Sequence, residues 1–209
     1  MKKIGISSRI VENFTYKESR DALSHEWGEF LEKIDLIPIQ IPNSLKSLDS
    51  FLKNIKLDGI ILSGGDNIGE FPKRDKTEKE LLEYGIQNKI PILGVCRGLQ
   101  IINEFFGGRI IKSNSGKHVG KNHQILLENE FKKRFFERVE VNSFHNNIIA
   151  ENQIGKNLQK FASDEEDKTV EGICHREFPI IGVMWHPERK QDNFNKNLVK
   201  TLFDEKKFW

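Results

Sequence analysis

The first half of the chain alternates short apolar runs with longer amphipathic stretches, and this order constrains the fold most strongly. Short apolar runs bounded by glycine, proline or polar residues are typical of buried strands, whereas apolar residues at every third or fourth position are typical of helices. Strand–helix alternation favours parallel strands joined by right-handed crossovers. Because the runs are continuously apolar, both faces of the sheet are expected to be covered. The sequence therefore predicts an α/β fold with a central, mostly parallel sheet.

The pattern sets the expected elements along the chain. In the first half, strands are predicted at 3–8, 36–41, 59–62 and 90–95, and helices at 18–33, 45–54, 76–87 and 97–106. In the second half, strands are predicted at 110–111, 124–127, 138–141, 158–162, 170–173 and 180–184, with a last helix at 193–203. Two polar segments, 66–76 and 113–122, are candidates for an active-site lid. With neither a repeat nor a linker, residues 1–209 are expected to form a single domain.

Charge and cysteine content limit the compartment and the partners. The 33 basic and 31 acidic residues leave a formal net charge of +2, which predicts neither a nucleic-acid nor a membrane partner. Two cysteines, Cys96 and Cys174, are too few for a disulfide framework. The first residues show no apolar signal region, and no apolar run is long enough to span a bilayer. We therefore expect a protein of the reducing cytoplasm, where a free thiol persists.

One segment, Ile90 to Gln100, has the form strand, Gly-x-Cys-x-Gly, helix. A nucleophile on a tight strand-to-helix turn is held in a strained conformation, and small residues two before and two after it relieve the crowding. Gly94 and Gly98 meet this need around Cys96. The motif alone also fits a buried core cysteine, but the strand before it and the helix after it favour a nucleophile. The N–H of Arg97 would then point to where an acyl oxyanion forms.

A second apolar strand delivers a histidine to the same sheet edge. His186, Pro187 and Glu188 follow the run at 180–184, so the carboxylate can reach back to the imidazole. A nucleophilic cysteine needs such a base, and the base needs a group that fixes its tautomer. His186 alone would more often be a structural histidine, but its place after a strand and beside Glu188 favours catalysis. We therefore predict a catalytic triad of Cys96, His186 and Glu188.

Two further groups complete the predicted site. The strand at 59–62 runs into Gly64 and Gly65, and the N–H of Gly65 is the expected second oxyanion donor beside that of Arg97. His118 and His123 could be metal ligands, but no carboxylate or cysteine cluster joins them in the sequence. The prediction is therefore an enzyme without a metal ion and without a cofactor.

Three motifs in this order, Gly-Gly, Gly-x-Cys-x-Gly-x-Gln and His-Pro-Glu, resemble the class I glutamine amidotransferase superfamily. The segments at 96–100, 141–145 and 170–172 resemble its stand-alone γ-glutamyl hydrolase branch, which includes enzymes of γ-glutamyl-γ-aminobutyrate. The resemblance implies a flavodoxin-like three-layer sandwich and a cysteinyl acyl-enzyme that releases glutamate. It also implies a set of residues that hold the glutamyl head of a small-molecule substrate: Gly64, Gln100, Ser143, Phe144 and His145.

Two departures from the family pattern concern the leaving-group side. Relatives often continue with proline and tyrosine after Gly-Gly-Asp, where this chain has Asn67 and Ile68. They often carry glutamine after the Val-Asn-Ser-x-His segment, where this chain has Asn146 and Asn147. The resemblance therefore leaves the second half of the substrate open. An amine is one alternative, and a nucleotide phosphoramidate such as γ-glutamyl-CDP-amidate is another, with Arg9, Arg20, Lys73 and Arg74 as candidate phosphate contacts.

Other functions share these motifs. A glutaminase subunit that supplies ammonia to a separate synthetase would carry the same triad and would need that partner. A binding or regulatory module of the same fold would not need an intact triad, and a related chaperone or protease would not need Gln100 beside His-Pro-Glu. The oligomeric state is open, with a homodimer as one alternative.

Overall fold

The computed structural model describes residues 1–113 and 118–209. In these residues a nine-stranded sheet has the order β4-β1-β5-β6-β13-β12-β11-β8-β9. Its strands are β1 (Lys2–Ser7), β4 (Leu36–Ile41), β5 (Gly59–Leu62), β6 (Ile92–Val95), β8 (Val119–Leu127), β9 (Arg138–Phe144), β11 (Leu158–Asp164), β12 (Val170–His175) and β13 (Ile180–Val183). Two small pairs stand apart, β2 (Arg9–Asn13) with β3 (Glu18–Ala22), and β7 (Ile111–Lys112) with β10 (Asn147–Ile148).

The sheet has a parallel half and an antiparallel half. Strands β4, β1, β5, β6 and β13 pair in parallel, whereas β13, β12, β11, β8 and β9 pair in antiparallel order. The parallel half comes mainly from the part of the chain in which strands and helices alternate, because a parallel return needs a crossover. The antiparallel half comes from the second part, where turns join consecutive strands. The result is the mixed, flavodoxin-like α/β sheet that the sequence predicts.

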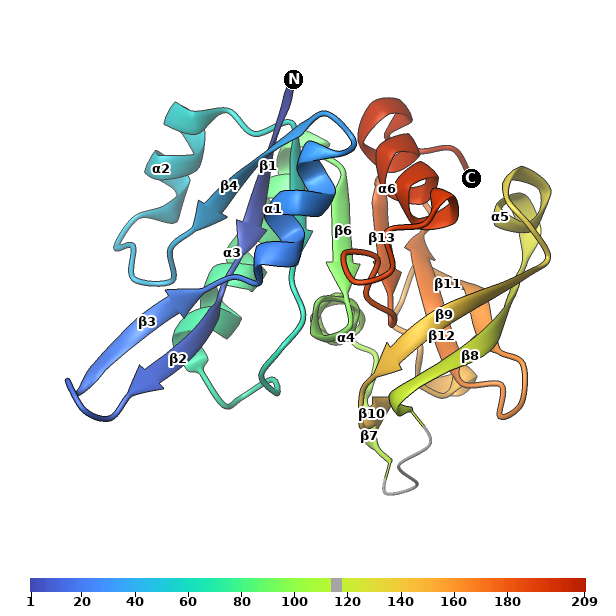
Figure 1. Ribbon diagram of the computed structural model, residues 1–209. Helices are drawn as coiled ribbons and strands as arrows, with labels where there is room; N and C mark the ends of the chain where they lie inside the picture. Colours follow the sequence, from blue (N-terminus) through green and yellow to red (C-terminus); the bar gives the residue numbers. More distant parts are fainter. Residues whose placement is uncertain (114–117) are drawn as a thin grey trace.

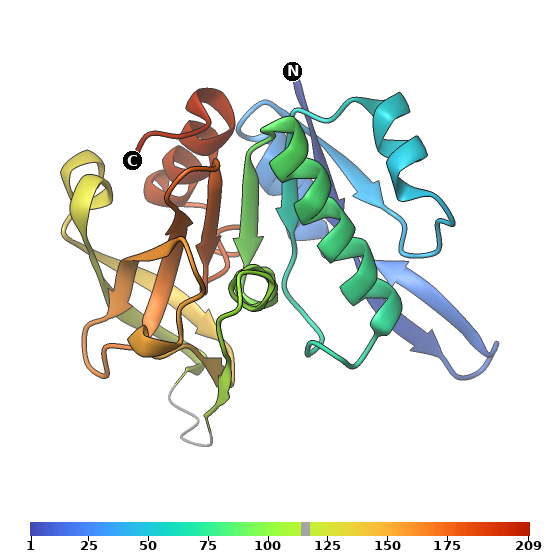
Figure 2. The same ribbon diagram turned by 180° about the vertical axis from the view of Figure 1, so that it is seen from behind.

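Helices cover both faces of the sheet and make three layers (Figures 1 and 2). On one face, α1 (His25–Glu32) and α6 (Asn193–Glu205) pack with α5 (Asn129–Arg134) in one apolar cluster. On the other face, α2 (Leu48–Ile55), α3 (Pro72–Asn88) and α4 (Arg97–Phe105) pack in a second cluster. A short 3₁₀ turn, η1 (Glu151–Gln153), precedes β11. Burial of each large apolar side chain in these clusters contributes about 1.5–3 kcal/mol, which holds the layers together.

Two neighbouring strands in the middle of the sheet end at the same edge. Strand β6 pairs in parallel with β13, and Val95 lies opposite Val183. The carboxyl end of β6 meets the start of α4 at the end of the sheet away from the two chain termini (Figure 1). This register brings the residues after each strand, Cys96 and the Met184–Glu188 segment, to one edge, where open α/β sheets bind ligands.

The predicted helix at 18–33 is wrong over its first third. Residues Glu18–Ala22 form β3, which pairs in antiparallel order with β2, and α1 begins only at His25. The buried residues at the centre of the helical period, Trp27, Phe30 and Leu31, lie within α1. Residues 18–22 carry no large apolar side chain, so the apolar period of the helix does not include them. The β2–β3 hairpin projects from the parallel half of the molecule (Figure 1).

Several other predictions change at their boundaries, including the strand predicted at 124–127, which runs from 119 to 127, and the two candidate lids. Helix α3 begins at Pro72, so residues 72–76 of the first candidate lid are helical. In the second candidate lid, residues 114–117 lie outside the described part of the chain, and residues 119–122 belong to β8. Four short elements were not predicted, namely β2, α5, β10 and η1, which have five, six, two and three residues and therefore carry little periodicity. Within the described residues, every helix is too short or too polar to cross a membrane.

Candidate active site

Cys96 occupies a strained turn between β6 and α4. Its backbone has φ 54° and ψ −103°, a combination that costs a non-glycine residue on the order of 1–3 kcal/mol. Close packing enforces the turn, because a Cβ on Gly98 would lie 2.0 Å from the carbonyl oxygen of Leu62. A Cβ on Gly94 would likewise lie 2.5 Å from the Gly98 carbonyl oxygen. The geometry is that of a nucleophile elbow, with the thiol at the N-terminus of α4.

His186 and Glu188 lie beside this thiol. Nδ1 of His186 lies 2.7 Å from Oε1 of Glu188, and both side chains are buried. The side chain of Cys96 interacts with the imidazole closely enough to raise the pKa of His186. Gly64 closes the group, since a Cβ there would lie 2.7 Å from Cε1 of His186 and 3.5 Å from Cβ of Cys96. The structure thus brings the three predicted triad residues and the predicted oxyanion loop together.

The surroundings of His186 change its pKa. Burial disfavours the charged imidazole, but the hydrogen bonds and negative charges of Cys96 and Glu188 outweigh burial and raise the pKa to about 9. An imidazolium at His186, paired with the carboxylate of Glu188, is therefore the favoured state at neutral pH. This state suits a residue that must deliver a proton to a leaving group.

The raised pKa of His186 predicts a pH-dependent stability. A raised pKa in the folded state contributes stability in full below the unfolded value of about 6.5, and the contribution is lost as pH rises through about 9. We expect urea unfolding to show that wild type loses up to about 3 kcal/mol of stability relative to His186→Asn between pH 6.5 and pH 9.5. If the free energy of unfolding depended on pH equally in the two proteins, the raised pKa of His186 would be contradicted.

A buried arginine orients the oxyanion loop. Nη2 of Arg74 donates to the carbonyl oxygens of Ser63, at 2.8 Å, and of Gly64, at 2.9 Å. In a trans peptide the C=O and the following N–H point in opposite directions. Arg74 therefore holds the Gly64 carbonyl inward and directs the N–H of Gly65 away from the protein core. Asp66 accepts a hydrogen bond of 2.9 Å from Nη1 and fixes the guanidinium.

A buried carboxylate connects this loop to the elbow. Oε1 of Glu78 accepts from Nε of Arg74 at 3.0 Å and from the hydroxyl of Ser7 at 2.7 Å. Its other oxygen pairs with Arg97, whose guanidinium also pairs with Asp75. Arg97 follows Cys96 directly, and its N–H is the first predicted oxyanion donor. One network of charges thus holds both predicted donors, a connection that the sequence analysis did not foresee.

Strand β9 holds the histidine in place from the other side. Oδ1 of Asn142 accepts from the backbone N–H of His186, and its Nδ2 donates to the His186 carbonyl oxygen, both at 2.8 Å. Phe144, on the same side of the strand, has its ring edge-on to the imidazole at 5.9 Å. Arg189 lies over the ring of Phe144 at 4.4 Å. Asn142, which lies within the motif at 141–145, was not predicted to hold the backbone of His186.

The other predicted substrate residues lie in two places. Gln100 is buried one turn after Cys96 on α4, and its Oε1 accepts from Nδ2 of Asn147 at 3.2 Å. Ser143 and His145 alternate with Phe144 and point to the other side of β9, where Ser143 donates to the His118 carbonyl oxygen at 2.8 Å. Their contact with a substrate stays a prediction.

Two pockets lie near the predicted triad, and only the second of them is lined by triad residues. One, of about 440 Å³, is lined by residues that include Asn67, Gln100 and Asn147. The other is a small cavity of about 30 Å³ against His186 and Glu188. Its walls also include Arg9, Ser24, Trp27, Gly64 and Arg189.

Of the four residues predicted as phosphate contacts, three lie away from the candidate site or are buried. The guanidinium of Arg74 is fully buried in the charge network, so it is not available to a ligand. Arg20 pairs with Glu18 on the hairpin, and Lys73 lines a separate pocket near α2. Arg9 alone of these reaches the site, because a Cβ on Gly65 would lie 3.0 Å from its Nε.

Comparison with known proteins places the chain in a family. Residues 15–206 match the family described as Glutamine amidotransferase class-I. The chain belongs to the class I glutamine amidotransferase family, and it is an amide-hydrolysing enzyme.

Individual relatives cover most of the chain. It is 34% identical to a gamma-glutamyl-CDP-amidate hydrolase of Campylobacter jejuni over 96% of each chain. It is 33% identical to a subunit of the glutamine-hydrolyzing GMP synthase of Pyrococcus furiosus, over 78% of this chain and 81% of the relative. A glutamine amidotransferase structure from Thermotoga maritima superimposes with a TM-score of 0.68 at 15% identity, covering 98% of this chain and 97% of that one. A crystal structure from Thermoplasma acidophilum gives a TM-score of 0.73 at 21% identity, with coverage of 97% and 93%. The two structures share the fold.

Proposed function

We propose that this chain is a cysteine-dependent hydrolase of γ-glutamyl amide bonds. The observation that carries the proposal is the buried arrangement of Cys96, His186 and Glu188 at the strained turn after β6. The similarity to a gamma-glutamyl-CDP-amidate hydrolase along nearly the whole chain supports a free-standing enzyme. The proposal includes residues 1–209 as a single domain that acts in the cytoplasm.

The proposed reaction has two halves. The thiolate of Cys96 attacks the γ-carbonyl carbon, and the N–H groups of Gly65 and Arg97 bind the oxyanion of the tetrahedral intermediate. The C–N bond breaks as the imidazolium of His186 gives its proton to the leaving nitrogen. His186 then takes a proton from water, which attacks the acyl-enzyme and releases glutamate. Glu188 holds the imidazole in orientation and stabilises its charged form.

The two pockets suggest how a substrate lies across the thiol. The amide groups of Asn67, Gln100 and Asn147 can donate and accept hydrogen bonds, as the amino and carboxylate groups of a glutamyl head require. The other side carries positive charge from Arg9, whereas Arg189 there is paired with Glu26 at 3.6 Å. Among the described residues no carboxylate pairs with Arg9, and its side chain belongs to an exposed residue. We propose that the leaving group is anionic, as in a nucleotide phosphoramidate such as γ-glutamyl-CDP-amidate.

Glutamate release from a panel of substrates tests this proposal. The panel holds glutamine, γ-glutamyl-γ-aminobutyrate, another γ-glutamyl amine and γ-glutamyl-CDP-amidate. Fast release from the phosphoramidate with little from glutamine is the expected result. Fast release instead from the γ-glutamyl amine whose leaving group carries no negative charge would overturn the proposal of an anionic leaving group. The proposal of a γ-glutamyl hydrolase would still stand.

A substitution at Arg9 tests the leaving-group side. Arg9→Met removes a charge-assisted hydrogen-bond donor but keeps much of the side-chain volume, and such bonds contribute about 1.5–3 kcal/mol. We expect kcat/KM for the phosphoramidate to fall roughly 10- to 100-fold, with little change for glutamine. Arg20→Met is the matched control, because Arg20 lies on the same hairpin and pairs with Glu18. Equal losses for both substrates in Arg9→Met would contradict this role.

A second candidate function is a glutaminase subunit that supplies ammonia to a synthetase. The similarity to a GMP synthase subunit favours it, since that relative spans a comparable length. In the substrate panel this function predicts slow release from glutamine alone. Release would then increase on addition of the synthetase partner.

A further inference from the structure

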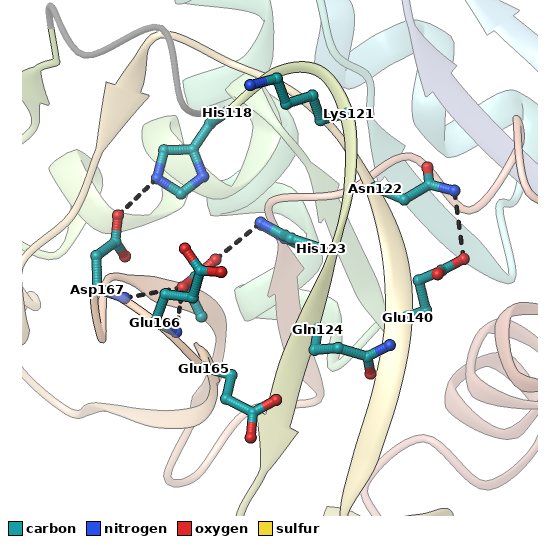
Figure 3. Close-up of a pocket in the computed structure, with 10 residues that line it drawn as sticks. His118, Lys121, Asn122, His123, Gln124, Glu140, Glu165, Glu166 and Asp167 are labelled. Atoms are coloured by element: carbon teal, nitrogen blue, oxygen red, sulfur yellow. Dashed lines mark hydrogen bonds and ion pairs between the residues drawn. The ribbon is translucent and has the colours of Figure 1, made fainter.

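A second buried cluster of titratable groups lies in the antiparallel half of the sheet. It joins His118 and His123, at and after the start of β8, with His145 after β9 and Glu171 on β12. The side chain of Glu171 is fully buried, and the exposed fractions of His118 and His145 are 3% and 4%. A pocket of about 670 Å³ opens onto His118 and His123 between β8 and the turn after β11 (Figure 3). The pocket gives solutes a path to the cluster.

One ring nitrogen of His118 and one of His145 are hydrogen-bonded to oxygen atoms outside the cluster. Nε2 of His118 lies 3.0 Å from a carboxylate oxygen of Asp167 (Figure 3). Nδ1 of His145 lies 2.9 Å from the carbonyl oxygen of Asn147. A carboxylate or carbonyl oxygen only accepts hydrogen bonds, so these nitrogens carry the protons. In the neutral imidazoles the inner nitrogens, Nδ1 of His118 and Nε2 of His145, are therefore bare lone pairs.

The inner atoms face one another without hydrogen-bond partners. Within the described residues, Nδ1 of His118, Nε2 of His145 and both carboxylate oxygens of Glu171 are buried and unpartnered. One ligand atom from each of these three residues lies within 4.8 Å of the other two. A buried set of acceptors is strongly unfavourable unless a positive charge lies between them.

The spacing suits a metal ion better than a direct hydrogen bond. Nε2 of His145 lies 3.4 Å from Oε1 of Glu171, which is longer than the usual N–H···O distance of about 2.7–3.2 Å. Zinc binds histidine nitrogen and carboxylate oxygen at about 2.0–2.2 Å, which separates two ligands of a tetrahedral site by about 3.3–3.5 Å. An outer hydrogen bond from a ligating histidine to a carboxylate or carbonyl is also the usual feature of such sites.

We propose that His118, His145 and Glu171 bind a divalent first-row metal ion of the zinc type. His123 lies beside the other carboxylate oxygen, with Nε2 3.4 Å from Oε2 of Glu171, and its Nδ1 lies 2.9 Å from a carboxylate oxygen of Asp164. Two imidazoles and one carboxylate form a ligand set that zinc accepts, with water in the fourth position. The sequence analysis expected no metal because no carboxylate adjoins His118 and His123 along the chain. The fold supplies Glu171 from a strand far along the sequence.

The ion would have a structural role next to the candidate active site. His145 is three residues from Asn142, which holds the backbone of His186, and two from Asn147, which contacts Gln100. The backbone N–H of Met184 also donates to the carbonyl oxygen of Glu171 at 2.8 Å. A metal at the cluster would therefore fix β9 and β12 against β13, the strand that is followed by His186.

Metal titration of the Cys96→Ser chain tests the proposal. This background removes the thiolate beside His186, which could itself bind zinc. Competition with a chromophoric chelator should give one Zn²⁺ per chain, and Co²⁺ should give the visible absorption of a four-coordinate nitrogen–oxygen site. Zn²⁺ should also raise the thermal unfolding temperature with increasing concentration. Absence of one-to-one binding by the folded chain would overturn the proposal and leave the cluster as a proton-binding site.

Variants in the same background locate the ion. Glu171→Gln removes a ligand and should abolish one-to-one binding. Asp167→Asn changes only the outer partner of His118 and should weaken affinity roughly 10- to 100-fold. His175→Gln is the control, because His175 is a buried histidine outside the cluster whose Nδ1 accepts two backbone N–H groups. Unchanged affinity in both Glu171→Gln and Asp167→Asn would contradict the assigned ligands.

Discussion

Cys96→Ala is expected to lower kcat for glutamate release by roughly 10⁴-fold or more, the loss seen when a covalent nucleophile is removed. The elbow places the thiol against the imidazole of His186, and the alanine methyl group cannot form an acyl-enzyme. Steady-state rates of glutamate release from the best substrate of the panel measure the effect. The fold should persist, because alanine is smaller than cysteine and can be accommodated in the same turn.

Cys174 provides the matched control. It is the other free cysteine, it is fully buried on β12, and burial raises the pKa of its thiol to about 12. Cys174→Ala should therefore keep its activity, and a glutamine-analogue affinity label should modify Cys96 and leave Cys174 unmodified. Near-normal turnover by Cys96→Ala, or equal labelling of the two cysteines, would show that Cys96 is not the nucleophile.

The parallel half of the fold was predictable because its signals are local. Each buried strand there, such as β5 and β6, is a short apolar run closed by glycine or a polar residue, and each helix has its own apolar period. The β2–β3 hairpin was not predictable in this way. Glu18–Ala22 is polar and largely exposed, so its strand conformation depends on pairing with Arg9–Asn13 rather than on its own pattern.

The candidate site likewise has a part that could be predicted from local motifs and a part that could not. The predicted triad residues follow strand ends within short motifs, so the sequence alone predicted that Cys96 and His186 lie at one sheet edge. The supporting groups come from distant segments and have no local signature. Glu78 lies in the middle of an amphipathic helix, where a charged residue is ordinarily exposed, and Glu171 lies in an apolar strand. Only the fold shows that the first meets two buried arginines and the second meets three histidines.

The charge network explains how a strained elbow stays in place. A backbone held in a sparsely populated conformation persists only where its surroundings determine it. Arg97 anchors the first turn of α4 to Glu78, and Arg74 anchors the glycine loop to the same carboxylate. The carboxylate therefore sets the distance between the two peptide groups that are proposed to bind the oxyanion. Loss of that carboxylate should affect both stability and catalysis.

Glu78→Gln is accordingly expected to destabilise the protein by about 3–5 kcal/mol, because each of two buried arginines loses one of its two carboxylate partners, with about 1.5–3 kcal/mol for each charge-assisted bond, and keeps only Asp66 or Asp75. Such a loss is a large part of the free energy of unfolding of a typical domain, which is about 5–15 kcal/mol. In the remaining folded protein, kcat should fall by up to roughly 10²–10³-fold, the effect of losing one oxyanion donor, with KM less affected. The carboxylate itself touches neither the thiol nor the imidazole, so this loss would act through the position of the N–H groups of Gly65 and Arg97.

Urea unfolding and steady-state kinetics at a temperature where Glu78→Gln stays folded measure the two effects separately. Glu80→Gln on the same helix is the control, because Glu80 is partly exposed and pairs with the exposed Lys76. An exposed pair of this kind contributes about 0–1 kcal/mol, so the control should keep both its stability and its rate. If Glu78→Gln is destabilised but keeps a normal kcat, the network stabilises the fold without positioning the oxyanion donors. If its stability matches that of the control, the two buried arginines are neutralised in another way, and the role assigned to Glu78 is wrong.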